Sequence, residues 1–436
     1  MMYRSTLVLM MFAIVVAEAR NPTASITTPY LLDIYGLEEW DSTKAVAPNV
    51  INNQVFTLGT WFGAYPCIDC SNQYPPMTWC NGGLPQLANL SEHGKSIIAD
   101  LDNTVPLNFT GYIVNDYESW TPLWNTTPAL YKNASLNLTA ARYPGIINAT
   151  ELERIAISEY EEAAMTFLIY TIRKVKEARP NAAGYGYYGY PNWPWWHCTD
   201  PAIVAQYQAW NDQMLPLWDE VTTLFPSIYL PYMSNVDEPL QGNLDYIRTH
   251  VQEAVRIKSF FVGKPSQGEE PSQKKIIPYA WHRYHDGEPH SLQLLDTLDT
   301  WVEFNYVLER GVISIPSSFA NGIAVDAIIA WGDEKDPQYG GDAVATKAWF
   351  VKYRAYFAGG GSVTEPPPSM FELRASTPMS GDARHGNKFP LESKHIPLRE
   401  RIETHMKRLE ADIRRLSMDS KAKRIDTIPP YKECSL

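Results

Sequence analysis

Residues 111–120 read GYIVNDYESW and join an apolar run to two acidic side chains. The run Gly111–Tyr117 is not a simple alternation of apolar and polar residues, which fits a parallel strand buried on both faces. Side chains two positions apart on a strand point to the same side, about 6.6 Å apart. The stretch therefore predicts a strand whose carboxyl end places Asp116 beside Glu118.

Similar strands alternate with helices along the chain. Further strands are predicted at Val55–Trp61, Gly186–Tyr190, Ser227–Tyr232, Ile276–Trp281 and Val325–Trp331, and helices from the capping box Thr150–Glu153 to Pro180, over Leu244–Phe261 and over Leu292–Leu308. This alternation favours a parallel α/β fold, most simply a (β/α) barrel, with an open doubly wound sheet as the alternative. No Gly-x-Gly-x-x-Gly follows an early strand, so a dinucleotide site is not indicated.

The charge is uneven along the 436 residues. The whole chain carries −12, which argues against a nucleic-acid partner. Residues 384–436 hold thirteen Lys and Arg against eight Asp and Glu, which leaves −17 on residues 1–383. A hydrophobic content of 45% is ordinary for a protein with a real core. The acidic body and the basic tail are therefore expected to be separate parts.

The amino-terminal segment has the three parts of a secretory signal peptide. Arg4 precedes the apolar run Thr6–Val16 and the small-residue end Ala17–Ala19, so residues 1–19 are expected to be removed; a buried helix or an anchor is the alternative. Six N-x-[ST] sequons agree with secretion: Asn89, Asn108, Asn125, Asn133, Asn137 and Asn148. We expect an extracellular protein, with the lysosome as the alternative, and no membrane span once the signal is removed.

Five cysteines allow two disulfides at most, with one thiol left over: Cys67, Cys70, Cys80, Cys198 and Cys434. Cys67-x-x-Cys70 also has the spacing of a redox or zinc motif. Neither a second such pair nor a nearby pair of histidines completes a zinc set, so no metal is expected.

Three regions follow the signal peptide. Residues 20–357 are expected to form the barrel domain, and residues 358–396, which contain Gly359–Ser362 and Pro366–Pro368, a linker. Residues 397–436 form a basic tail, in which Leu398, Ile402, Leu409, Ile413 and Leu416 predict an amphipathic helix. Such a helix can self-associate, pack back on the body or touch acidic surfaces, and its short length favours packing back or marginal order.

Aromatic residues gather at other predicted strand ends. Gly186–Pro191 reads GYYGYP and is followed by Trp193, Trp195 and Trp196, while Tyr229 and Trp331 end two further strands. Aromatic faces stack on sugar rings, and one of two close carboxyl groups keeps its proton to higher pH. Together these features indicate a carbohydrate cleft with a general acid; solvated loop acids and ordinary core aromatics are the alternatives.

Seven segments then occur in the order found in one enzyme family: Asn81–Leu90, Asp116–Glu118 with Trp120 and Pro122, Tyr131–Asn133, Gly186–Pro191, Pro226–Tyr229, Glu253–Arg256 and Ile328–Gly332. They span roughly residues 55–335. On these segments the chain resembles the hyaluronidase family of glycoside hydrolases, which implies a distorted, TIM-like (β/α) barrel.

The resemblance implies a role for each matching residue. Glu118 would protonate the glycosidic oxygen, Asp116 would share that proton and steady the N-acetyl group, and Tyr229 would orient that group. The acetamido carbonyl of the substrate would be the nucleophile, so that the configuration is retained. Substrate-binding positions implied by the resemblance are Tyr188, Trp331, Tyr190, Trp120 and Arg256. No metal or cofactor is implied.

The chain also departs from the family pattern. Thr121 stands where most members have an arginine beside the substrate, which weakens recognition of a uronate carboxylate. Local positive charge would have to come from Arg256, Lys258, His282, Arg283 and His285. The cysteine pattern differs, and the family's cysteine-rich C-terminal module is replaced by the linker and the tail.

The resulting expectation is a secreted endo-β-N-acetylhexosaminidase that hydrolyses β-1,4 bonds in a glycosaminoglycan. Hyaluronan is the first candidate and chondroitin the second. A glycan-binding protein that has lost turnover is a further alternative, against which the presence of Glu118 argues. An unrelated α/β hydrolase is disfavoured because no G-x-S-x-G motif occurs.

Overall fold

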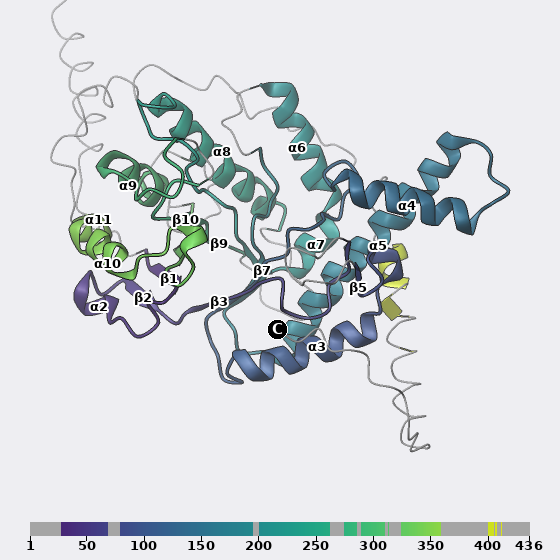
Figure 1. Ribbon diagram of the computed structural model, residues 1–436, viewed down its shortest axis with the longest axis horizontal. Helices are drawn as coiled ribbons and strands as arrows, with labels where there is room; N and C mark the ends of the chain where they lie inside the picture. The colour runs from purple at the N-terminus through teal and green to yellow at the C-terminus, as the bar shows by residue number, and fades with distance from the viewer. Residues whose placement is uncertain are drawn as a thin grey trace, which may run out of the picture.

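A computed structural model describes residues 28–68, 79–194, 200–261, 274–285, 289–309, 313, 324–358, 400–404, 406–407 and 411 (Figure 1). The predicted signal peptide, nearly all of the predicted linker and most of the predicted tail lie outside these residues.

The strands form parallel sheets in the middle of the molecule. One sheet has the order β10 (Tyr279–Trp281), β11 (Ile328–Asp333), β1 (Tyr30–Tyr35) and β2 (Val50–Asn52). A second has the order β3 (Val55–Leu58), β6 (Tyr112–Asn115) and β7 (Gly184–Tyr187), and a third pairs β8 (Thr223–Leu224) with β9 (Lys275–Ile276). The chain thus has the predicted parallel α/β architecture.

The sheets follow one another around a distorted barrel. Residues 53–54 separate β2 from β3, and residues 277–278 separate β9 from β10. Pro278 has no N–H to donate, which accounts for the second break. The backbone N–H of Thr222 donates to the Tyr185 carbonyl oxygen at 3.0 Å, which links β7 to the segment entering β8. The described strands thus pair as three separate parallel sheets placed in sequence around the barrel, and not as one continuous closed sheet.

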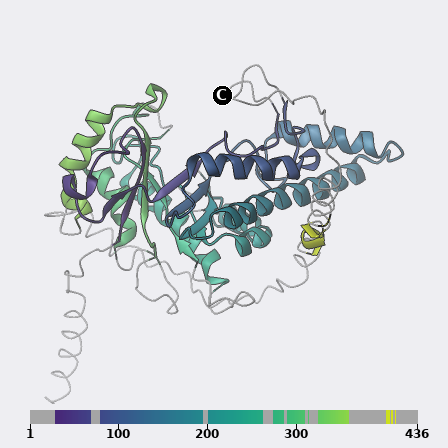
Figure 2. The same cartoon turned by 90° about the horizontal axis from the view of Figure 1, so that it is seen from below.

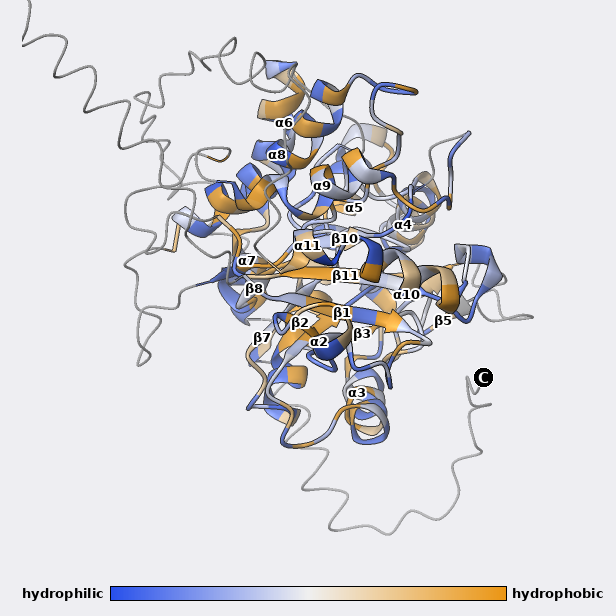
Figure 3. Cartoon of the chain, turned by 90° about the vertical axis from the view of Figure 1, so that its left-hand side faces the viewer, coloured by the Kyte–Doolittle hydropathy of each residue, from blue (hydrophilic) through white to orange (hydrophobic). Residues whose placement is uncertain are grey.

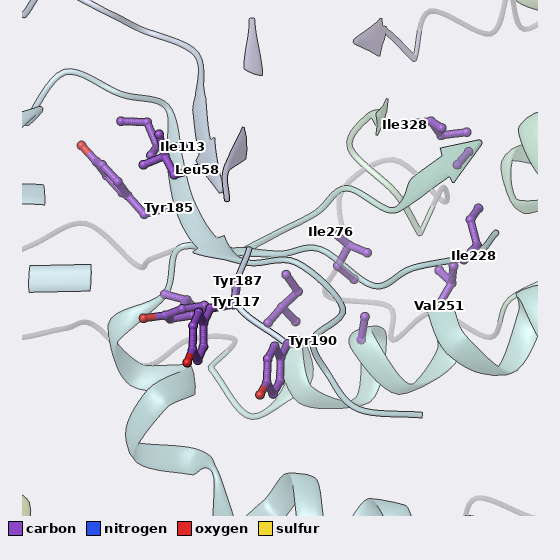
Figure 4. Packing of buried hydrophobic residues seen from close by; sticks show 14 of the residues in the cluster. Leu58, Ile113, Tyr117, Tyr185, Tyr187, Tyr190, Ile228, Val251, Ile276 and Ile328 are labelled. Atoms are coloured by element: carbon purple, nitrogen blue, oxygen red, sulfur yellow. The ribbon is translucent and has the colours of Figure 1, made fainter. Parts of the chain in front are cut away.

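Alternate residues of each strand face two different cores. Ile113 and Ile328 are fully buried among side chains that lie between the strands and the helices (Figure 4). Val114 and Ile329 are fully buried in a second cluster, with Leu31, Val55 and Tyr279, on the other side of the strands. Burial on both faces explains the near-continuous apolar runs, which Figure 3 shows along β1 and β11.

Helices surround the strands. They are α2 (Ser42–Ala45), α3 (Leu90–Thr104), α4 (Ala129–Arg142), α5 (Ala149–Ala178), α6 (Pro201–Gln213), α7 (Leu215–Glu220), α8 (Leu240–Ser259), α9 (Thr297–Phe304), α10 (Ala343–Lys352) and α11 (Arg354–Phe357), with single 3₁₀ turns at Pro85–Leu87, Tyr306–Leu308 and Pro337–Tyr339. The antiparallel pair β4 (Cys67–Ile68) and β5 (Trp79–Cys80) lies outside the barrel sheets. Figures 1 and 2 show that α4 and the start of α5 project from the body.

The long helix predicted from the capping box is confirmed as α5, with a different cap. The Asn148 side chain accepts hydrogen bonds from the N–H groups of Thr150 and Glu151. Asn148, and not Thr150, is therefore the residue that caps the start of the helix. The predicted helix over Leu292–Leu308 is shorter, because Asp296 caps α9 and Leu292 has a φ of 65°, in the left-handed region.

One predicted strand is wrong, and several short or early strands were missed. Residues 227–232 contain a single bridge, from Ser227 to Tyr279, while the strand itself lies earlier as β8. Pro226 lies directly before that segment and Pro231 lies within it, and neither has an N–H to donate to a neighbouring strand. The missed strand that matters most for the site is β1, which pairs with β11 on one side and with β2 on the other.

The described part of the tail packs on the body. Residues 400–404 and 406–407 are helical, and Ile402 and Met406 are only 1% and 2% exposed. Glu403 pairs with Arg173 of α5 at 2.9 Å, and Arg401 pairs with Glu162 of the same helix. This agrees with the preferred expectation that the tail packs back; self-association stays a prediction.

Candidate active site

Asp116 and Glu118 lie just beyond the carboxyl end of β6. The backbone N–H of Asp116 donates to the Leu58 carbonyl oxygen at 2.9 Å, so the pairing of β6 with β3 continues to this carboxylate. Both side chains line cavities that open at this end of the strands. The structure thus places the predicted carboxyl pair at the end of the barrel where parallel strands present their functional groups.

The surroundings of this pair favour protonation. Burial, followed by the negative charges of Glu118 and Asp33, raises the pKa of Asp116. Burial also raises the pKa of Glu118. Within the described residues, Asp116 Oδ1 is buried and accepts no hydrogen bond. Because no cation in the described part of the chain offsets these effects, the pair holds a proton to a higher pH than free carboxyl groups would.

A third carboxyl group stands behind the pair. Asp33 on β1 accepts a hydrogen bond from Thr57 Oγ1, which lies 2.6 Å from the Tyr279 hydroxyl. Burial raises the pKa of Asp33 to about 7. The sequence analysis missed Asp33 because it missed β1. The signal was present in YLLDIY (Tyr30–Tyr35), an apolar strand interrupted by a single acid.

The larger of two cavities at this site has a volume of about 570 Å³. It is lined by Thr57, Asp116, Glu118, Tyr188, Tyr229, Tyr279, Trp281, His285, Ser291, Leu292, Trp331, Gln338 and Tyr339. The Tyr229 ring stacks on Trp331 at 6.0 Å between centroids and lies 5.9 Å from the Tyr188 ring. Burial raises the pKa of Tyr229 well above its usual value, so its hydroxyl remains a hydrogen-bond donor.

The smaller cavity has a volume of about 300 Å³. It is lined by Tyr117, Glu118, Trp120, Thr121, Tyr188, Gly189, Tyr190, Asn192, Trp193, Ser227, Tyr246 and His250. Glu118 and Tyr188 line both cavities, so Glu118 stands at their junction. A chain ligand that crosses this junction would present the bond between two of its units to the Glu118 carboxyl group.

Most of the predicted binding residues reach the cavities. Tyr188 lines both, Trp331 lines the larger cavity, and Tyr190 lines the smaller one. Trp120 borders the smaller cavity but is only 1% exposed, and its indole N–H donates to the Pro66 carbonyl oxygen at 2.7 Å. Its contribution is therefore to fix the loop that carries Glu118. Trp195 and Trp196 lie outside the described residues.

Arg256 is not brought to the cleft. It lies on α8 and lines neither cavity; its guanidinium binds Glu253 at 2.7 Å and Asp212 at 2.8 Å. The spacing of Glu253 and Arg256 was the signal for such a pair, since residues three apart on a helix are neighbours.

Three of the other four candidate cations lie beside carboxylates that line neither cavity, and the fourth is in the larger cavity. Lys258 lies 3.5 Å from Asp326, while His282 and Arg283 contact Glu334 at 2.9 and 3.4 Å. Only His285, in the larger cavity, lines the site.

Two further features concern metals and cysteines. No group of three or more His, Cys, Asp or Glu side chains is arranged to hold a metal within the described residues. Cys67 and Cys80 are register partners in β4 and β5, and the other three cysteines lie outside the described part of the chain. Disulfide pairing therefore stays a prediction. No helix in the described ranges is long and apolar enough to cross a membrane.

Comparison with known proteins identifies the family of the chain. A family model described as hyaluronidase matches residues 36–312. The chain is 36% identical over 207 residues to Hyaluronidase-5 of Mus musculus, covering 45% of this chain and 36% of that protein. It is 37% identical over 183 residues to Chondroitin hydrolase of Caenorhabditis elegans, covering 41% and 39%. The matches thus span well under half the length of these two relatives.

A solved structure has the same fold. The crystal structure of bee venom hyaluronidase in complex with a hyaluronic acid tetramer superposes with a TM-score of 0.55 at 22% identity, covering 75% of this chain and 96% of that chain. This similarity supports the distorted barrel.

Proposed function

Because the chain belongs to the hyaluronidase family, we propose that it is an endo-β-N-acetylhexosaminidase that hydrolyses β-1,4 bonds in hyaluronan. The observation that carries the proposal is the buried Asp116–Glu118 pair at the junction of two aromatic cavities. Chondroitin is the second candidate substrate, because one of the relatives is a chondroitin hydrolase.

In the first step, Glu118 gives its proton to the glycosidic oxygen while the bond from that oxygen to the anomeric carbon breaks. The acetamido carbonyl oxygen of the same sugar attacks the anomeric carbon and forms a cyclic oxazolinium ion, so no enzyme nucleophile is required. Asp116 lies beside this group, and its unbonded Oδ1 can accept the acetamido N–H. Tyr229 orients the acetamido group by hydrogen bonding.

In the second step, water opens the cyclic intermediate. The Glu118 carboxylate accepts a proton from the water molecule as its oxygen bonds to the anomeric carbon, which regenerates the acid and releases a sugar of retained configuration. The raised pKa of Glu118 suits both roles, since the group must be protonated in the first step and basic in the second.

Secretion is part of the proposal. The signal-like segment 1–19 supports it, as do the six sequons. All six sequon asparagines are exposed, and Asn125, Asn133, Asn137 and Asn148 lie on or beside the projecting helices α4 and α5, where an attached glycan would extend into solvent.

The test is a size analysis of hyaluronan and unsulfated chondroitin after incubation with the secreted full chain, from pH 4 to 7.5. Glu118→Gln is run in parallel, because it keeps the shape of the side chain and removes the transferable proton. We expect even-numbered saturated oligosaccharides from the wild type alone. A folded wild type that binds these polymers without cutting either would identify a glycan-binding protein instead.

A further inference from the structure

The smaller cavity is where the sugar on the leaving side of the cut bond would bind. Glu118 must reach the glycosidic oxygen, so the sugars on either side of that oxygen occupy the two cavities that meet at Glu118. Tyr229, which orients the acetamido group in the proposed function, lines the larger cavity. The leaving sugar therefore occupies the smaller cavity. In hyaluronan and in chondroitin this sugar is a glucuronate, whose carboxylate is charged near neutral pH.

Among the residues that the structure describes, those that line the smaller cavity include no lysine or arginine. The one basic side chain in this described lining is His250, whose pKa burial lowers to about 4, so that the imidazole is uncharged near neutral pH. Its Nδ1 also lies 2.7 Å from the Tyr246 carbonyl oxygen, within hydrogen-bonding distance. A carboxylate in this cavity would lose hydration without gaining a counter-ion, which is unfavourable.

The cavity does present neutral donors. The indole N–H of Trp193 and the hydroxyl of Tyr246 are buried and lack a hydrogen-bond partner among the residues that the structure describes. Trp193 and Tyr246 are 9% and 1% exposed. Uncharged N–H and O–H donors match the hydroxyl and acetamido oxygens of a sugar, and the rings of Tyr190 and Trp193 provide apolar faces for it.

The rim around the site, formed by the segments that follow the barrel strands, is also poor in positive charge. The described segments that follow the barrel strands are residues 36–41, 59–66, 116–128, 188–194, 200, 225–239, 282–285, 289–296 and 334–342; together they contain twelve Asp and Glu and two Lys and Arg. Both cations face acids of the rim: Arg283 is buried and lies 3.4 Å from Glu334, and Lys335 lies 2.7 Å from Glu38. A rim of this sign repels a polyanion at low ionic strength.

From these observations we infer that the site is built for an uncharged sugar on the leaving side of the bond. The preferred substrate class is then a neutral β-linked N-acetylhexosamine chain, and hyaluronan is accepted in spite of its carboxylates. This inference rests on the proposed function, since it assumes that Glu118 cuts between the two cavities.

The test compares hyaluronan with carboxyl-reduced hyaluronan of the same length, in which each glucuronate is a glucose. We expect kcat/KM for the reduced polymer to exceed that for hyaluronan by about tenfold or more in 10 mM salt near pH 6. The ratio should narrow in 0.5 M salt, because salt screens the repulsion by the rim. Equal rates, or faster cleavage of hyaluronan at low salt, would overturn the inference.

A pair of variants tests the smaller cavity separately from the rim. Thr121 lines this cavity, and its hydroxyl lies 2.6 Å from that of Thr126. Thr121→Arg places a cation there and should raise the hyaluronan rate at least about fivefold relative to the reduced polymer. Thr121→Gln is similar in length but neutral and should leave the ratio of the two rates unchanged. An identical ratio in both variants would contradict the role of the cavity.

Failure of the inference can be told apart from failure of the proposed function. If Glu118→Gln cuts either polymer as fast as the wild type does, the proposed acid is wrong and both proposals fall. If cleavage depends on Glu118 but hyaluronan is the better substrate at low salt, the proposed function stands and only the preference for an uncharged sugar is rejected.

Discussion

The two cavities that meet at Glu118 differ in what they can do to a bound sugar. The larger one contains Asp116 and Tyr229, with Asp33 hydrogen-bonded to Thr57 behind them. The smaller one shares Glu118, but its described lining contains no second carboxyl group, and the other polar side chains there are neutral donors and acceptors near neutral pH. In the proposed mechanism the bond-breaking groups are therefore collected on one side of the cut, and only positioning groups lie on the other.

Removing the acid at the junction should have the largest effect. Glu118→Gln is expected to lower kcat by about a thousandfold, because general acid catalysis contributes about 10²–10⁴ in rate. Glu161→Gln is the matched control: burial also raises the pKa of Glu161, but its carboxylate accepts the N–H of Trp124 and lines neither cavity. Initial rates on one polymer check this; a tenth of the wild-type rate in Glu118→Gln would refute the assignment.

Replacing one tyrosine in each cavity tests whether the two cavities differ in function. Tyr229→Phe should lower kcat by about a hundredfold with little change in KM, because it removes a hydrogen bond made to the reacting acetamido group. Tyr190→Phe, in the smaller cavity, should change KM by only a few-fold. Steady-state measurements of kcat and KM for the two variants test this prediction. Equal losses of kcat would contradict the proposed difference in function between the cavities.

Asp33 should set the upper pH limit of activity. Its negative charge is one cause of the raised pKa of Asp116, so Asp33→Asn should lower the pKa of the Asp116–Glu118 pair. Because catalysis requires a proton on that pair, the alkaline limb of kcat/KM should move to lower pH, by up to about one unit. Glu92→Gln, an exposed change on α3, makes the same change in net charge and should leave the limb in place. A shift to higher pH would contradict the account.

The tail should matter least to catalysis, because its described residues contact α5 and line neither cavity. Deletion of residues 384–436 should leave kcat/KM within about twofold. It should lower the melting temperature by a few degrees, since Ile402 and Met406 lose their buried positions. An unchanged melting temperature would show that the tail does not pack on the body in solution.

The sequence predicts the parts of the site that depend on local pattern. Asp116 and Glu118 could be placed because an apolar run ends directly before them, and the aromatic residues because they cluster after another strand. The predicted strand over residues 227–232 is wrong because burial of an apolar run does not require strand pairing, and Pro226 and Pro231 were the contrary signal.

The remaining parts depend on contacts between distant segments. Asp33 approaches the site because β1 pairs with β11, which joins Tyr30 to Ile328, and no local pattern encodes that pairing. Arg256 was expected in the cleft, yet the packing of α8 turns it toward Asp212 and Glu253. Sequence resemblance matched the residue to its motif, but only the tertiary structure shows which way its helix faces.

The central claim is that Glu118 acts with the substrate's own acetamido group. The most direct test is to follow the anomeric proton of the first product by NMR during cleavage of short oligosaccharides, before mutarotation. The account predicts that the new reducing end appears as the β-anomer and that Glu118→Gln forms none. Initial appearance of the α-anomer would mean direct attack by water and would contradict the mechanism.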